Sequence, residues 1–268
     1  MSRDTVHDIR PGDRWVVVVA HPDDETFGCG SLIAHAAQRG AHVTVICATS
    51  GEAGERTPEI ADDADLGEVR AAELFEAARL LGAVDVELLH YADSGFDGDL
   101  PARSLCAAPL AELTAWLIAR LQELAADVVV VIDGSDGHRD HLHVRASAEQ
   151  AITMLAGATL LLVGLPNHLM RQWLDEMRSV DPDSPYQAID AAQLGTPDHL
   201  VTDVIEHPEL LSVRDEAIAA HRSQRSPFED LSADLRRSFL VSTHLIRAGS
   251  AERLLPRSGA MHDRRTRL

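Results

Sequence analysis

Short runs of apolar, mostly β-branched residues alternate along the chain with longer stretches whose apolar residues recur every three or four positions. The short runs predict strands buried on both faces, and the longer stretches predict amphipathic helices. Strands are expected at residues 16–20, 42–47, 86–89, 128–132, 159–165 and 199–204. Helices are expected at residues 28–38, 66–81, 105–125, 141–155, 167–178 and 209–221. This alternation predicts an α/β fold, a Rossmann-like and mostly parallel sheet with helices on both faces.

Chain length limits how these elements are organised. A chain of 268 residues is long enough for one substantial domain, and no internal repeat calls for more. We expect an N-terminal extension at residues 1–14, a single α/β domain at residues 15–250 and an arginine-rich, disordered tail at residues 251–268.

The first predicted strand ends in a group of polar residues. His21, Asp23, Asp24 and Glu25 follow residues 16–20 at once. Burying carboxylates side by side costs several kcal/mol unless a cation or strong donors compensate. Asp23 or Asp24 taken alone could be only the N-cap of the next helix, but a second cluster downstream changes the interpretation.

That second cluster follows the fourth predicted strand. His138 and His141 lie three residues apart, so both rings project to the same side if a helix begins there. In the common order of doubly wound sheets, the first and fourth strands are neighbours where the order reverses, and ligands bind beyond their carboxyl ends. Topology alone is therefore expected to bring the two clusters together as a metal site.

The two clusters resemble the motifs of a known family. Ala-His-Pro-Asp-Asp-Glu at residues 20–25 is the hallmark of the LmbE-like, or PIG-L-like, zinc-dependent N-acetylglucosamine deacetylases. His-Arg-Asp-His at residues 138–141 is similar to the family's His-Pro-Asp-His motif, with Arg139 in place of the proline. Further similarity lies at residues 48–52, 70–73, 91–95 and 220–224. The resemblance spans residues 15–225 in matching order and implies a deacetylase domain at residues 15–250.

The resemblance implies a catalytic metal centre. Its implied zinc ligands are His21, Asp24 and His141. Three protein ligands leave a fourth position for water, as catalytic zinc requires. Zinc lowers the pKa of such a water towards about 7 and polarises the amide carbonyl. Zn²⁺ is the expected cofactor, with another divalent ion such as Fe²⁺ as the alternative.

The resemblance also implies catalytic residues beside the metal. Asp23 would be the general base that takes the proton of the water, and His138 would protonate the leaving amine or stabilise the oxyanion. Asp140 is a further catalytic candidate that could orient one of the histidines. The alternative for Asp140 is a residue that only complements the helix dipole.

Other positions bear on the substrate. Arg70 and Asp93 resemble the family's substrate-binding arginine and sugar-hydroxyl-binding aspartate, although each could have an ordinary surface or capping role. His221 could border the pocket or be structural. Two positions depart from the family. Asp136 stands where some mycothiol-pathway members carry a tyrosine that donates to the oxyanion, and Arg139 adds a positive charge near the entrance.

Composition restricts partners and compartment. With 24 basic and 43 acidic side chains the formal net charge is −19, so neither nucleic acid nor an anionic membrane is expected as a partner. The three cysteines cannot form a closed disulfide set and lack zinc-type spacing, which favours a reducing compartment. The polar N-terminus and the lack of any apolar run near 18 residues predict a cytoplasmic protein without a membrane span. The oligomeric state stays open.

These observations leave several functions to compare. The first is a zinc-dependent hydrolase that removes the N-acetyl group from an N-acetylglucosamine-type glycoside, such as a GlcNAc-inositol or a natural-product sugar. The second is an amidase that cleaves a larger linear amide, such as a mycothiol-type conjugate. A third is a non-catalytic dinucleotide-binding module, because Gly28 and Gly30 follow a strand, but Ile33 stands at the third glycine position. A magnesium phosphoesterase would use Asp23 and Asp24, but the nearby histidines favour a softer metal.

Overall fold

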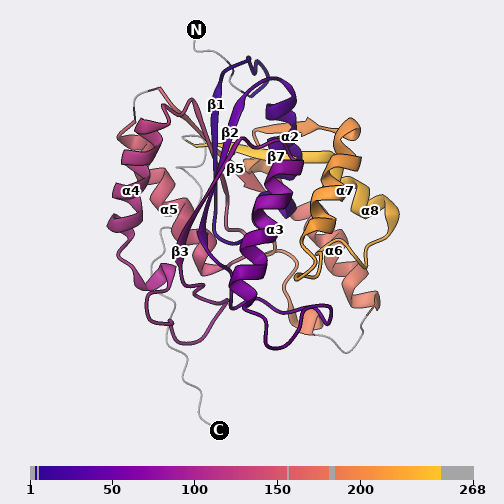
Figure 1. The fold of residues 1–268 in the computed structure, drawn as a ribbon. Helices are drawn as coiled ribbons and strands as arrows, with labels where there is room; N and C mark the ends of the chain where they lie inside the picture. Colours follow the sequence, from indigo (N-terminus) through magenta and orange to yellow (C-terminus); the bar gives the residue numbers. More distant parts are fainter. Residues whose placement is uncertain (1–3, 5, 156, 181–184, 249–268) are drawn as a thin grey trace.

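One sheet runs through the molecule with helices on both sides (Figure 1). The structure is a computed structural model that describes residues 4, 6–155, 157–180 and 185–248. Among these residues, seven strands are ordered β3-β2-β1-β4-β5-β7-β6. Their bounds are β1 Arg14–Val19, β2 His42–Thr49, β3 Asp85–Tyr91, β4 Val128–Ile132, β5 Thr159–Gly164, β6 Asp203–Glu206 and β7 Ser242–Arg247. The strands β1 to β5 are parallel, whereas β7 is antiparallel to both β5 and β6, so the predicted mostly parallel sheet is confirmed.

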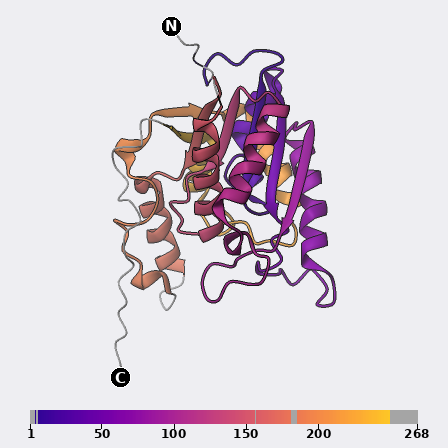
Figure 2. The same ribbon diagram turned by 90° about the vertical axis from the view of Figure 1, so that its left-hand side faces the viewer.

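The valines of β1 are buried on both faces of the sheet, as an unbroken apolar run predicts. Val17 and Val19 face one helical layer, and Val16 and Val18 face the other. The first layer contains α2 (Gly30–Gln38), α3 (Leu66–Leu80) and α7 (Leu211–Ala220). The second contains α4 (Leu110–Glu123) and α5 (Arg139–Thr153), the side that faces the viewer in Figure 2.

The remaining helices extend the layers near the end of the sheet formed by β5, β7 and β6. Residues of α6 (Asn167–Val180) and α8 (Ala233–Val241) share an apolar cluster with Phe228 and Leu231. A short helix, α1 (Asp24–Phe27), follows β1 directly. Single 3₁₀ turns lie at Leu105–Ala107, Pro185–Ala188, Asp198–Leu200 and Pro208–Leu210. No helix among the described residues has both the length and the apolar character needed to cross a bilayer.

Two predicted elements differ from the structure, and two further elements were not predicted. The helix predicted at residues 105–125 is interrupted, because Ala108 precedes Pro109 and is extended, with φ −72° and ψ 143°. The strand predicted at residues 199–204 is a 3₁₀ turn followed by β6, which begins at Asp203. The helix α8 and the strand β7 were not predicted, because no turn signal separates them: α8 ends at Val241 and β7 begins at Ser242.

Parts of the predicted N-terminal extension pack on the domain. Val6 is fully buried in the same apolar cluster as Val17, and Asp4 forms an ion pair with Arg247 at the end of β7. The predicted tail and the domain end at residue 250 lie outside the described residues. The domain limits therefore stay a prediction.

A buried histidine pair joins α2 to the segment after β6. The rings of His35 and His207 lie 4.4 Å apart, and neither ring nitrogen of His207 has a hydrogen-bond partner among the described residues. Burial, together with the charges of His35, Arg214 and Arg39, lowers the pKa of His207 to about 3. The folded state therefore keeps this ring neutral, whereas the unfolded chain protonates it near pH 6.5.

This pair predicts a loss of stability in mild acid. Because the pKa of His207 is lower in the folded state than in the unfolded chain, this residue does not change the free energy of unfolding above pH 6.5. As the pH falls from 6.5 towards 3, it lowers the free energy of unfolding, by about 2 kcal/mol at pH 5. Urea unfolding at pH 7.5 and pH 5 should show a smaller acid loss for His207→Leu than for the wild type. The exposed His199→Asn serves as control and should keep the wild-type loss; equal losses for all three proteins would contradict the assignment.

Candidate metal centre

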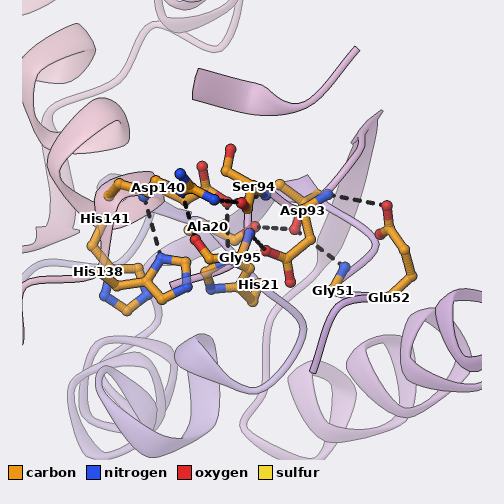
Figure 3. A network of polar contacts seen from close by, with 12 residues as sticks. Ala20, His21, Gly51, Glu52, Asp93, Ser94, Gly95, His138, Asp140 and His141 are labelled. Carbon is orange, nitrogen blue, oxygen red and sulfur yellow. Dashed lines mark hydrogen bonds and ion pairs between the residues drawn. The ribbon is translucent and has the colours of Figure 1, made fainter. Parts of the chain in front are cut away.

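Both polar clusters lie at the carboxyl edge of the sheet, where the strand order reverses. The strands β1 and β4 pair directly, from Trp15 opposite Val128 to Val18 opposite Val131. His21 follows β1, and His138 is the N-cap of α5 after β4. The predicted meeting of the two clusters is confirmed, because the rings of His21 and His138 lie 4.5 Å apart (Figure 3).

The three residues predicted as metal ligands gather around one carboxylate oxygen. Asp24 Oδ2 lies 3.1 Å from His141 Nε2 and 3.5 Å from His21 Nδ1. It also accepts a hydrogen bond from the backbone N–H of His21 at 2.9 Å. All three side chains are buried. Two imidazole nitrogens and one carboxylate oxygen form a donor set that suits catalytic zinc.

The second nitrogen of each histidine faces a further carboxylate. His21 Nε2 lies 3.3 Å from Asp140 Oδ2, and His141 Nδ1 lies 2.6 Å from Asp136 Oδ2. A ring that donates its outer N–H in this way keeps the inner nitrogen available to a metal. Against burial, the charge of Asp24 and the hydrogen bond to Asp136 raise the pKa of His141 to about 10. The place between these groups therefore favours positive charge, and the residues fit a divalent ion.

The contact of Asp136 with His141 was missed by sequence reasoning, which noted only that Asp136 replaces a tyrosine. The turn between β4 and α5 contains Gly134 and Gly137, both with positive φ, 72° and 84°. This Gly-Ser-Asp-Gly turn brings Asp136 back towards the start of α5. The turn signal was present in the sequence, but its effect on the direction of Asp136 could not be derived from spacing alone.

His138 lies beside the proposed ligands with its ring nitrogens in distinct environments. The backbone N–H of Asp140 donates to His138 Nδ1 at 3.2 Å, which places the ring proton on Nε2. Nitrogens of His21, His138 and His141 lie within 4.8 Å of one another. Burial, with the charges of His21 and His141, lowers the pKa of His138. A neutral ring with an Nε2–H is suited to donating a hydrogen bond rather than to binding metal.

Asp23 occupies an unusual backbone conformation next to the proposed ligand Asp24. Its φ is 138°, a region that residues with a side chain rarely adopt. Two contacts hold it there: its N–H donates to Glu25 Oε2 at 2.9 Å, and Arg70 Nη2 donates to its Oδ2 at 3.0 Å. Burial raises the pKa of Asp23 to about 6, although the charge of Arg70 opposes the shift. Strain of this kind tends to occur at functional positions.

The two predicted substrate-binding residues, Arg70 and Asp93, both line the cavity, and both side chains already make contacts within the protein. Arg70 is 3% exposed, and its donors bind Asp23, the carbonyl of Pro22 at 2.7 Å and the carbonyl of Gly51. Asp93 Oδ1 accepts from the N–H of Gly95 at 2.7 Å and lies 3.6 Å from His21 Nε2. Their role in binding a substrate stays a prediction, and the contacts show that Arg70 also fixes Asp23.

A buried layer beneath the site was only partly anticipated. His221 Nε2 lies 2.7 Å from Glu25 Oε1, and both side chains are fully buried, so the structural interpretation of His221 is the one that its contacts support. Glu73 on α3 accepts from both the N–H and the hydroxyl of Ser223, at 2.9 and 2.6 Å. Two similar segments of the family, residues 70–73 and 220–224, thus bind to each other below the first motif.

The site opens into a cavity of about 650 Å³. One part of its lining is polar and contains His21, Asp23, Asp24, Arg70, Asp93, Asp136, His138 and His141. Another part is apolar and contains Phe27, Phe96, Ile132, Leu165, Met170, Trp173, Phe228 and Phe239. Such a volume holds a ligand of disaccharide size.

A second group of possible metal ligands is a weaker candidate for a metal site. His35, His207 and Glu209 also lie close enough to share an ion. However, Arg39 Nη1 donates to His35 Nδ1 at 2.8 Å, which leaves the proton of His35 on Nε2, and the guanidinium charge opposes a cation. The candidate metal centre is therefore the group of residues at the edge of the sheet beside β1 and β4.

Comparison with known proteins agrees with this geometry. The profile of the PIG-L family, described as GlcNAc-PI de-N-acetylase, matches residues 16–152. A relative from Geodermatophilus obscurus, named 1D-myo-inositol 2-acetamido-2-deoxy-alpha-D-glucopyranoside deacetylase, is 32% identical over 86% of this chain and 90% of its own. A relative of the same name from Rhodococcus jostii is 33% identical over 90% of this chain and 94% of its own.

The fold has solved counterparts as well. The N,N'-diacetylchitobiose deacetylase from Pyrococcus horikoshii superposes with a TM-score of 0.61 at 18% identity, covering 92% of this chain and 90% of that one. At this identity the likeness concerns the fold, whereas the family follows from the sequence matches. The chain belongs to the PIG-L, or LmbE-like, family of deacetylases.

Proposed function

We propose that the protein is a zinc-dependent N-deacetylase that removes the acetyl group from an N-acetylglucosamine-type glycoside, with a GlcNAc-inositol as the first candidate. The observation that carries the proposal is the pair of histidines, His21 and His141, each held by an outer carboxylate and turned towards Asp24. The names of the relatives support the sugar class. Three free cysteines support a cytoplasmic location.

The proposed metal ligands are His21, Asp24 and His141. A zinc ion held there would polarise the acetamide carbonyl and lower the pKa of a water molecule. Asp23 would accept the proton of the attacking water, and Arg70 would hold the Asp23 carboxylate in place. His138 Nε2–H would donate to the developing oxyanion, or give its proton to the amine nitrogen as the C–N bond breaks. Asp140 would act through His21, whose outer nitrogen it faces.

The other functions considered find less support. The cavity is large enough for the second candidate, an amidase for larger amides, and its apolar part would suit an apolar group on such a substrate. Of the two glycines behind the dinucleotide hypothesis, Gly28 has a packing role, because a Cβ there would lie 2.9 Å from Ile132 Cδ1 and 3.1 Å from the carbonyl oxygen of Asp24. The two histidines beside Asp24 argue against hard magnesium.

The ligand assignment predicts the metal content of variants. Wild-type protein should hold about one zinc ion per chain, and His141→Ala should lose both zinc and deacetylation of N-acetylglucosaminyl-inositol. Asp136→Asn should bind zinc about 10–100-fold more weakly, because it orients His141. The control is His143→Ala on the same helix, outside the cavity. Elemental analysis that finds full zinc in His141→Ala would remove His141 from the ligand set.

Substitutions of the adjacent residues Asp23 and Asp24 should impair different properties, turnover in one case and zinc affinity in the other. Asp23→Asn should keep zinc and lose about 10²–10⁴ fold in kcat, the usual contribution of a positioned proton acceptor. Asp24→Asn should lose zinc affinity first, so that excess zinc restores part of the activity. Acetate release and zinc titration measure both effects. The roles are reversed if Asp23→Asn empties the site while Asp24→Asn keeps it filled.

Arg70 should affect catalysis as well as binding. Because its guanidinium holds Asp23, Arg70→Ala should lower kcat and also raise KM, with a combined loss on the order of 1–3 kcal/mol in kcat/KM. Arg79→Ala, which removes an exposed charge from the same helix, is the matched control. A change in KM alone would limit Arg70 to substrate binding, and no change in either constant would exclude both roles.

A further inference from the structure

Arg139 makes a set of contacts that a proline at this position could not make. It is the first residue of α5, between His138 and Asp140. Its guanidinium donates to the carbonyl of Gly95 at 2.7 Å, of Asp97 at 2.9 Å and of Gly98 at 3.0 Å, and also to that of Ser94. One side chain thus gathers four carbonyls of the segment at residues 94–98.

The same segment is tied to α5 through a second residue. The N–H of Ser94 donates to Asp140 Oδ2 at 2.9 Å, the oxygen that also faces His21 (Figure 3). Gly95 and Gly98 have φ of 69° and 77°, which lets the segment curl so that its carbonyls converge. Two consecutive residues of α5 therefore hold one loop: Arg139 binds its carbonyl groups, and Asp140 binds the N–H of Ser94.

The curled segment presents an aromatic side chain to the site. Phe96 is 64% exposed, lines the cavity and lies 5.5 Å from the ring of His138 at an angle of 76°. An edge-to-face contact of this kind restricts the orientation of both rings. An exposed aromatic residue at the mouth of a cavity is suited to contacting a bound molecule.

The contacts give Arg139 a role that the sequence did not show. The sequence indicated only that Arg139 adds a positive charge near the entrance, and the structure directs its donors at the four carbonyl oxygens. Carbonyl dipoles pointing at a guanidinium stabilise its charge locally and leave fewer donors for a ligand. The side chain is therefore organised to hold the backbone of the loop.

We propose that Arg139 is a positioning residue that fixes residues 94–98 as a wall of the metal cavity and so places Phe96 against His138 and the bound glycoside. This inference rests on the proposed function for its kinetic consequences. Without the guanidinium the loop opens, the Phe96 contact is lost, and the glycoside binds less tightly. The zinc ligands stay in place, because His21 and His141 keep Asp140 and Asp136 as partners.

The test uses hydrogen exchange and kinetics on the full chain. Arg139→Ala should raise amide exchange in peptides covering residues 94–98, keep its zinc, and raise KM for N-acetylglucosaminyl-inositol by about 10-fold or more. Added methylguanidinium should restore part of both properties. Arg145→Ala, which removes a guanidinium from the same helix, is the control and should leave the loop exchange unchanged. Phe96→Ala should raise KM without raising backbone exchange.

Each outcome decides the proposal. Unchanged exchange at residues 94–98 in Arg139→Ala would overturn it, as would loss of zinc in that variant, since the effect would then belong to the metal centre. If Arg139→Ala does not fold, Arg139→Lys provides the same readouts, because one ammonium group cannot reach all four carbonyls. Unchanged amide exchange at residues 94–98 in Arg139→Lys would also overturn the proposal. If the wild type releases no acetate from any N-acetylglucosaminide, the proposed function fails, while the exchange data still decide whether Arg139 holds the loop.

Discussion

The burial of carboxylates at the end of β1 is the constraint on which the rest of the site depends. Asp23, Asp24 and Glu25 are consecutive, the first half-buried and the other two buried, so each needs its own compensating group. Glu25 has His221, Asp23 has Arg70, and Asp24 has His21 and His141. His21 follows β1, and the other three partners come from α3, from α5 and from the end of α7. The negative charge thus holds distant elements together around one edge of the sheet.

The three carboxylates differ in the partners that balance their charge and in their access to the cavity, and these differences suit catalysis. The pair of Glu25 and His221 is fully buried, so it acts as a support. Asp23 keeps one guanidinium contact and opens to the cavity, which leaves it able to exchange a proton. Asp24 lies between two imidazoles whose outer nitrogens are already held by carboxylates, and this arrangement favours a dication over a lone proton. The support, the proposed base and the proposed ligand are thus three consecutive residues with three different environments.

Much of this arrangement could be predicted from the sequence, because it follows from patterns that act locally. The apolar run before His21 and the one before the second cluster predicted β1 and β4, and general sheet topology predicted that they pair. The contacts of Asp136, Arg139 and Glu25 could not be predicted, because they depend on the path of loops and on side-chain directions. Arg139 illustrates the difference: its presence was noticed at once, but its four carbonyl partners lie more than forty residues earlier in the chain.

The central claim is that two histidines and one aspartate bind the metal while His138 remains a hydrogen-bond donor. X-ray absorption at the zinc edge of the loaded protein tests it most directly. The account predicts a four-coordinate ion with two imidazole nitrogens and two oxygens at about 2.0–2.1 Å, one oxygen from the carboxylate of Asp24 and one from water. Three imidazole nitrogens would make His138 a ligand and contradict the account, and so would a shell made of oxygen atoms alone.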